Sequence, residues 1–230
     1  MTAHLLSSHA DTFAHDHLPP VDEWPVFVFD RPEVQYPEQL NATQALVDQH
    51  IAQGKGERIA LYGENANGSY SWTYQELHDK VNKIANVLTH DMGLVSGNRL
   101  LLRGGNSPMM AACFLAGIKA GLVMVPTMPL LRAAELKTII DKAKVKAALC
   151  ANHLIDELDY CLDTTHPHHA PELKQVMAFA SDASDGLEAH MAKSSTQFTA
   201  HPTSRDDVCL IAFTSGTTGK PKGTMHFHRD

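Results

Sequence analysis

From about residue 40 onward, segments with helical spacing of apolar residues alternate with short apolar runs of strand length. The clearest helix begins at Thr73, which has the T-x-x-E spacing of a capping box with Glu76, and it stops near Gly93. The apolar residues that recur at helical spacing within it are Leu77, Val81, Ile84, Ala85, Leu88 and Met92. This pattern predicts an amphipathic helix.

The same pattern predicts the other elements. Further helices are expected over Ala42–Ala52 with Asn41 as N-cap, after Ser107-Pro108, and over Ala133–Ala143. Strands are expected over Arg58–Tyr62, Arg99–Gly104, Leu122–Pro126, Lys146–Cys150, Lys174–Phe179 and Asp207–Thr214. A turn-rich stretch at 64–70 separates the first strand from the long helix. Strands that alternate with helices predict an α/β fold, with a mostly parallel sheet flanked by helices. Such sheets bind ligands beyond the carboxyl ends of their strands.

The charge balance and the hydropathy of the chain argue against two classes of binding partner, nucleic acids and membranes. The 230 residues carry 19 basic and 26 acidic side chains, a net charge of −7 at pH 7. Nucleic-acid binding needs a basic surface that displaces phosphate counterions, so we expect no nucleic-acid partner. No apolar run approaches the roughly 20 residues that span a bilayer, and the first residues lack the features of a signal peptide. We therefore expect a cytoplasmic protein without a membrane partner.

The cysteines show no C-x-x-C spacing, and most of them lie in apolar segments. We expect them to be buried small apolar residues in a reducing compartment, not nucleophiles. They are Cys113, Cys150, Cys161 and Cys209.

Histidine is frequent, with 15 residues. Four lie in a polar leader that we expect to be mobile, namely His4, His9, His15 and His17. Three more, His166, His168 and His169, lie in a proline-flanked segment. Because no second group of ligands has recognisable zinc spacing, we expect a solvated loop there and no metal site.

The segment with the most distinctive chemistry is Thr214–Gly223, TSGTTGKPKG, directly after the last predicted strand. Its glycines let backbone N–H groups converge on an anion, its hydroxyls donate to phosphate oxygens or contact a magnesium ion, and its lysines add positive charge. These groups predict a cradle for a polyphosphate. The glycines are Gly216, Gly219 and Gly223, the hydroxyl residues are Thr214, Ser215, Thr217 and Thr218, and the lysines are Lys220 and Lys222.

The segment is not a Walker P-loop. Two residues separate Gly216 from Gly219 where that pattern needs four, and Pro221 follows Lys220. The proline also prevents a helix from starting directly at Lys220, so a helix dipole aimed at the phosphate is not expected.

TSGTTGKPKG resembles the signature loop of the adenylate-forming superfamily, which includes acyl- and aryl-CoA ligases, luciferases and the adenylation domains of peptide synthetases. Trp72–Leu77 resembles the early TYxEL helix start of that family, and Gly117–Pro126 resembles its KAGxxxVP segment. The resemblance covers about residues 35–230. Trp24–Asp48 and Gly223–Asp230 are most similar to aryl-CoA ligases of the benzoate and 2-aminobenzoate type.

The resemblance implies a two-step reaction with ATP, Mg²⁺ and coenzyme A, in which an aromatic carboxylate becomes an acyl-adenylate and then a thioester. It implies phosphate contacts from Thr214, Ser215, Thr217, Thr218, Lys220 and Lys222, with Gly216 and Gly219 allowing close approach of the backbone. Lys222 is the catalytic candidate and Thr217 the candidate magnesium contact. His226 and His228 fall where the family has a histidine just past the loop, in a structural, substrate-neighbouring or proton-transfer role.

We expect four regions: a mobile leader and N-terminal extension over 1–34, a first α/β subdomain over 35–180, a surface loop or connection over 181–206, and a strand with a phosphate-binding loop over 207–230. The family continues into an acid pocket and a C-terminal lobe that this sequence lacks, so we expect an N-terminal fragment, inactive alone. The last strand then awaits partners, from another copy of the chain or none. Two other functions stay open, a non-catalytic nucleotide- or phosphate-binding module and a ligase for a fatty or amino acid, and a homo-oligomer is compatible with the sequence.

Overall fold

A computed structural model describes the chain except for residues 1–5, 25, 27, 29–30, 66 and 215–220. The strands of the main sheet are β3 (Arg99–Arg103), β4 (Val123–Thr127), β5 (Val145–Ala151), β6 (Gln175–Phe179), β7 (Val208–Thr214) and β8 (Lys222–Phe227). Their order is β6-β5-β3-β4-β7-β8, and every neighbouring pair is parallel except β7 and β8. The predicted mostly parallel α/β sheet is confirmed.

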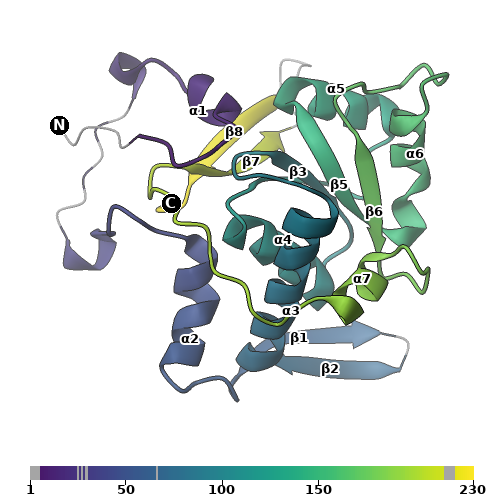
Figure 1. The fold of residues 1–230 in the computed structure, drawn as a ribbon. Coiled ribbons are helices and arrows are strands. Elements are labelled where there is room, and N and C mark those ends of the chain that lie inside the picture. Colours follow the sequence, from purple (N-terminus) through teal and green to yellow (C-terminus); the bar gives the residue numbers. More distant parts are fainter. Residues whose placement is uncertain (1–5, 25, 27, 29–30, 66, 215–220) are drawn as a thin grey trace.

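Helices cover both faces of this sheet (Figure 1). The longer helices are α3 (Tyr74–Asn86), α4 (Pro108–Lys119), α5 (Ala133–Ala143), α6 (Asp156–Leu162) and α7 (Leu187–Lys193), and two short ones are α1 (Phe13–Asp16) and α2 (Gln49–Ala52). One apolar core lies between the sheet and α3, α4 and α7, and a second lies under α5 and α6. Alternate residues of β3 enter different cores: Leu100 and Leu102 the first, Leu101 the second. No helix among the described residues has both the length and the apolar character to cross a bilayer.

The predicted capping residues begin the helices as expected. The Thr73 hydroxyl accepts from the Glu76 N–H at 3.2 Å, and the Glu76 carboxylate accepts from the Thr73 N–H at 2.8 Å. Ser107 accepts from the N–H of Met110 at 3.1 Å. Asn41 likewise accepts from two backbone N–H groups at the start of the helical stretch that ends in α2. Local hydrogen bonds therefore fix these starts, which is why the sequence predicts them.

The first predicted strand extends further than expected. β1 (Ile59–Asn65) and β2 (Gly68–Thr73) form an antiparallel hairpin, so most of the stretch predicted to be a turn is strand. Gly63 and Tyr70 face each other, and a Cβ on Gly63 would lie 2.5 Å from the Tyr70 ring. The glycine thus makes room for the aromatic side chain. The many turn-forming residues of this stretch led to the prediction of a turn in place of this strand pairing.

The stretch 181–206, predicted to be an aperiodic surface loop, contains the helix α7. Leu187 and Met191 lie four residues apart on this helix, and both are buried in the core that α3 also lines. Two apolar residues are too few to reveal a helical period in a polar sequence, which explains why the helix was missed.

The polar leader is packed in part. Ala14 is fully buried, and the carboxylate of Asp11 lies 2.7 Å from a guanidinium nitrogen of Arg99, the first residue of β3. The described residues from 7 to 18 therefore contact the sheet, in a region where the sequence predicts a mobile leader. Long-range ion pairing of this kind has no signature in the local sequence.

Candidate functional site

The glycine-rich segment connects β7 to β8. Thr214, the last residue of β7, is the register partner of Lys222, the first residue of β8, and both are exposed. The structure therefore brings these two predicted phosphate contacts together at the end of the hairpin where the connecting segment leaves it. The other predicted contacts, including the candidate magnesium contact Thr217, lie outside the described residues: Ser215, Gly216, Thr217, Thr218, Gly219 and Lys220.

The strand β7 does not await partners. It lies between β4 and β8, because β8 pairs with β7 in antiparallel orientation over its whole length. The expectation of an unpaired strand, or of one completed by another copy, was therefore wrong. The short KGTMHF run had no visible strand signal, since its apolar residues are few.

Gly223 allows the two strands of the hairpin to approach closely. A Cβ at this position would lie 2.8 Å from the Ile211 side chain and 3.3 Å from the Phe213 ring, both on β7. The glycine thus serves packing within the hairpin, beside Lys222.

A further lysine reaches the segment from α5. The Lys142 ammonium donates to the carbonyl oxygen of Pro221 at 2.7 Å, so it fixes the residue that precedes Lys222. The sequence offered no signal for this contact, because nothing in the residues around Lys142 indicates a partner 79 positions away.

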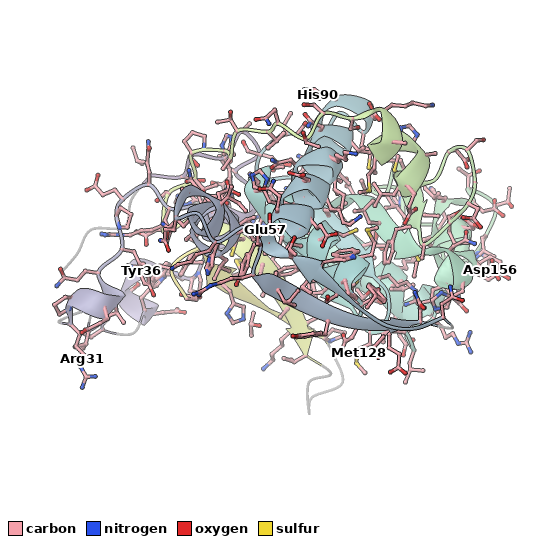
Figure 2. All side chains as sticks on the ribbon, turned by 90° about the horizontal axis from the view of Figure 1, so that it is seen from below. Arg31, Tyr36, Glu57, His90, Met128 and Asp156 are labelled. Carbon is pink, nitrogen blue, oxygen red and sulfur yellow. The ribbon has the colours of Figure 1, made fainter. Side chains whose placement is uncertain are left out.

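The carboxyl end of β4 lies at the same edge. β4 and β7 are parallel with Met124 opposite Leu210, so the end of β4 runs beside the end of β7. The residues that follow β4 present Met128 to solvent with 63% of its surface exposed, at the outer rim of the molecule in Figure 2. Ligands of parallel sheets bind at this edge, so the hairpin lies where the fold places a binding site.

Arg103, the last residue of β3, holds the chain that follows β4. Its guanidinium donates to the carbonyl oxygens of Met128 at 3.1 Å, Pro129 at 2.8 Å and Leu131 at 2.7 Å, and the residue is 1% exposed. Burial lowers the pKa of Arg103 from its ordinary value, and a guanidinium remains charged at neutral pH nonetheless. The edge therefore carries a fixed positive charge that the sequence analysis did not single out.

The two histidines past the segment differ in their surroundings. His226 is partly exposed, and its ring nitrogen lies 3.4 Å from the hydroxyl of Thr224. His228 is buried and its Nδ1 accepts the N–H of Ala42 at 3.1 Å. A nitrogen that accepts a backbone N–H carries no proton, so His228 is a neutral structural side chain and His226 is the one open to a ligand.

The cysteines are buried, as predicted. Burial raises the pKa of Cys150 and of Cys209 to about 12 and that of Cys161 to about 11, and it also raises the pKa of Cys113. A thiol is nucleophilic only as thiolate, so these side chains serve packing.

The histidines of the proline-flanked segment contact one another and a nearby tyrosine. The His166 ring stacks on Tyr160 at 4.6 Å and lies 5.3 Å from the ring of His168. Within the described part of the chain, no group of three or more His, Cys, Asp or Glu side chains is arranged to hold a metal ion.

These features match a known family. The family model described as AMP-binding enzyme matches residues 48–230. The chain belongs to this family. Its relatives include a benzoate–CoA ligase of Thauera aromatica, 31% identical over 86% of this chain and 36% of that protein. They also include an acetyl-coenzyme A synthetase of Bacillus subtilis, 24% identical over 83% of this chain and 33% of that protein. The family is thus one of adenylate-forming acyl-CoA ligases.

Solved structures of the family share the fold. The anthranilate CoA ligase AuaEII in complex with anthranoyl-AMP superimposes with a TM-score of 0.73 at 19% identity, over 84% of this chain and 35% of that one. ATP-bound MatB of Rhodopseudomonas palustris superimposes with a TM-score of 0.70 at 27% identity, over 83% of this chain and 35% of that one. The chain spans about a third of the length of the curated relatives described above.

Proposed function

We propose that the protein containing this chain activates an aromatic carboxylic acid, of the benzoate or 2-aminobenzoate type, with ATP and transfers the acyl group to coenzyme A. The observation that carries the proposal is the register pair of Thr214 and Lys222, which brackets the TSGTTGKPKG segment at the carboxyl edge of the sheet. A hydroxyl and an ammonium group at this position suit the oxygens of a polyphosphate.

The reaction has two steps. A carboxylate oxygen attacks the α-phosphorus of ATP, the bond to the pyrophosphate oxygen breaks, and pyrophosphate leaves with the electron pair. The thiolate of coenzyme A then attacks the acyl carbon, and AMP leaves with the electrons of the acyl–oxygen bond. Negative charge grows on the leaving pyrophosphate in the first step, so donors aimed at it lower the barrier.

The residues of the hairpin have distinct roles in this scheme. Lys222 provides the charge that stabilises the leaving pyrophosphate, and Thr214 donates a hydroxyl hydrogen bond to the same group. Pro221 is fixed by Lys142, which limits the positions open to Lys222. A magnesium ion supplies further charge neutralisation when it is bound with ATP, and hydroxyl and phosphate oxygens are the ligands it prefers. The remaining members of the segment keep the phosphate-contact roles that the resemblance implies.

The aromatic substrate rests on two likenesses. The benzoate–CoA ligase relative is 31% identical, and the opening and closing segments of the chain resemble aryl-CoA ligases. The acetyl-coenzyme A synthetase relative shows that the same family covers aliphatic acids, so the acid must be identified by experiment.

The test is carboxylate-dependent exchange of pyrophosphate into ATP, measured on the protein from its whole natural reading frame. The panel contains benzoate, 2-aminobenzoate, hydroxybenzoates, acetate, a medium-chain fatty acid and an amino acid. We expect exchange stimulated by one aromatic acid. Stimulation by an aliphatic or amino acid alone would overturn the aromatic substrate, and ATP binding without any exchange would favour a non-catalytic nucleotide-binding module.

A matched pair of variants tests the role of Lys222. Lys222→Ala is expected to reduce acid-dependent exchange about 100-fold, because the leaving pyrophosphate loses a charge-assisted contact. Lys193→Ala removes an exposed lysine at the end of α7 and serves as the control. Equal exchange in the two variants would remove Lys222 from the catalytic machinery.

A further inference from the structure

The described residues at 7–24 contact the base of the hairpin that carries the glycine-rich segment. Ser7 and Ser8 donate their hydroxyl groups to the carboxylate of Asp207, and the Ser8 N–H donates to it as well. Asp207 immediately precedes β7, so these bonds hold the base of the β7–β8 hairpin.

The same stretch is attached to the centre of the sheet. The N–H groups of Ala10 and Asp11 donate to Ser96 at 3.0 Å and 2.9 Å, and the Asp11 carboxylate pairs with Arg99 at 2.7 Å. Ser96 and Arg99 lie at the start of β3, with β4 between β3 and β7. Residues 7–11 therefore link the starts of β3 and β7 across the intervening strand.

Asp207 and His228 close the hairpin at its base. The His228 N–H donates to the Asp207 carbonyl at 3.2 Å, and the His228 ring accepts from Ala42. The side chains of Asp207 and His9 are each 1% exposed and lie 3.9 Å apart. Burial opposes ionisation of Asp207, but the His9 imidazole and the donors of Ser7 and Ser8 together lower the pKa of its carboxyl.

Further along, the stretch runs beside β8. The Trp24 ring stacks on Phe227 with 5.5 Å between centroids. A groove of about 400 Å³ separates the two segments, and its lining residues are His17, Leu18, Pro19, Glu23 and Trp24 on one side and Gly223, Thr224, Met225 and Phe227 on the other. The stretch thus contacts β8 at Phe227 and lines the same groove as Gly223, next to Lys222.

β7 packs beside β4, and Lys142 and His228 also attach the hairpin to its surroundings. The described pairing between β4 and β7 consists of one register pair, Met124 with Leu210, whereas β3 and β4 share five. β8 is the edge strand of the described sheet, with β7 on one side only. Groups outside the strand ladder therefore contribute to the orientation of the hairpin.

We propose that residues 7–24 form a brace that positions the phosphate-binding hairpin. Asp207, at the base of the hairpin, is the main residue through which the brace acts. The inference rests on the function proposed above. The six residues of β8 extend roughly 20 Å from the base to Lys222, so a rotation of about 3° at the base moves Lys222 by about 1 Å. A misplacement of about 1 Å is enough to reduce a rate about 100-fold where geometry governs the reaction.

The test compares four forms of the whole protein: the parent, Ser7→Ala/Ser8→Ala, Ser7→Thr/Ser8→Thr and Thr12→Ala. The alanine pair removes the two hydroxyl donors to Asp207, and the threonine pair keeps them. Thr12→Ala is the control, because its hydroxyl donates only to Asp16 within the same segment among the contacts described. Each form is assayed for kcat and for the KM of ATP in acid-dependent exchange, and for hydrogen exchange of β3 and β8.

We expect the alanine pair to lower kcat by up to about 100-fold with a smaller change in the KM for ATP, and to speed amide exchange in β8 but not in β3. The threonine pair and Thr12→Ala are expected to behave as the parent. An unchanged kcat with unchanged β8 exchange would overturn the brace. Equal acceleration in β3 and β8 would also overturn it, since that result describes a general loss of stability.

Asp207→Asn gives a second measurement, because it removes the charge that the two serines and His9 face. Faster β8 exchange than β3 exchange in this variant supports the brace, and no difference contradicts it. If the parent protein shows no acid-dependent exchange, the proposed function fails, and the hydrogen-exchange comparison alone then decides whether residues 7–24 hold the hairpin.

Discussion

The ammonium group of Lys119 lies 2.8 Å from a carboxylate oxygen of Asp48, with 1% of the lysine side chain exposed and 23% of the aspartate side chain exposed. The ammonium also donates to the amide oxygen of Asn82 at 2.6 Å. Lys119 lies in the KAG segment through which the chain resembles its family, and the pair ties the end of α4 to the helical stretch before α2. Its two charges thus differ in their access to water.

This difference predicts that removing the aspartate and removing the lysine lower the free energy of unfolding by unequal amounts. Asp48→Asn leaves a buried ammonium without a counter-charge and is expected to lower the free energy of unfolding by about 3–5 kcal/mol. Lys119→Met leaves a carboxylate that water reaches and an apolar chain of similar length, with an expected loss of about 1–2 kcal/mol. Urea denaturation of the two variants measures the difference. Equal losses would show that the buried ammonium is not the dominant cost.

The buried histidine at the base of the hairpin predicts an acid-sensitive stability. Burial, together with the nearby His9 and His201, lowers the pKa of His228 to about 4, and Asp207 acts in the opposite direction. The unfolded imidazole, with a pKa near 6.5, binds more protons between these values, so stability falls as the pH drops from about 6.5 to about 4. The expected loss from this group is about 3 kcal/mol.

The variant His228→Asn tests this assignment. It removes the titrating group, so the slope of unfolding free energy against pH between 4 and 6.5 should become shallower. His153→Gln removes an exposed histidine and should keep the parent slope. His9, whose pKa is also lowered by burial, is expected to leave part of the slope in place. A parent-like slope in His228→Asn would show that other groups cause the acid sensitivity.

The close packing at Gly223 predicts that a larger side chain there will destabilise the hairpin. In Gly223→Ala the new methyl group lies 2.8 Å from the Ile211 side chain, which is buried, so the two strands must separate. We expect a loss of about 1–3 kcal/mol in unfolding free energy and a weaker affinity for ATP. Gly105→Ala is the control, since a Cβ there meets nothing within 4 Å. Thermal denaturation with and without ATP separates the loss of stability from the loss of ATP affinity. An unchanged ATP affinity would show that Gly223 does not contribute to the binding site.

Much of the fold follows from local sequence signals. The capping pair of Thr73 and Glu76, and the N-cap Ser107, act over three residues, so their hydrogen bonds can be inferred from spacing alone. The buried strands β3 and β5 contain apolar runs, Leu100–Leu102 and Ala147–Ala151, of the kind that parallel sheets require. The helix α7 and the strand β8 lack such signals, and both were missed.

The residues of the candidate site also fall into two groups, those that local sequence predicts and those that it does not. Thr214 and Lys222 could be predicted as neighbours of one segment, and the structure pairs them across the hairpin. Arg103 and Lys142 could not be predicted, because they reach backbone carbonyls 25 or more residues away and nothing in their own surroundings indicates the partner. The phosphate contacts themselves remain predictions from the resemblance.

The link between Ser7 and Asp207 joins residues 200 positions apart. A ribosome adds about 5–20 residues per second, so Ser7 is made roughly 10–40 s before its partner. During that interval the brace has its attachment points at Ser96 and Arg99 but not the carboxylate it holds. Among the contacts of the brace, those to Asp207 are therefore the last to form during synthesis, and premature capture of the free serines by another chain is a hazard specific to that interval.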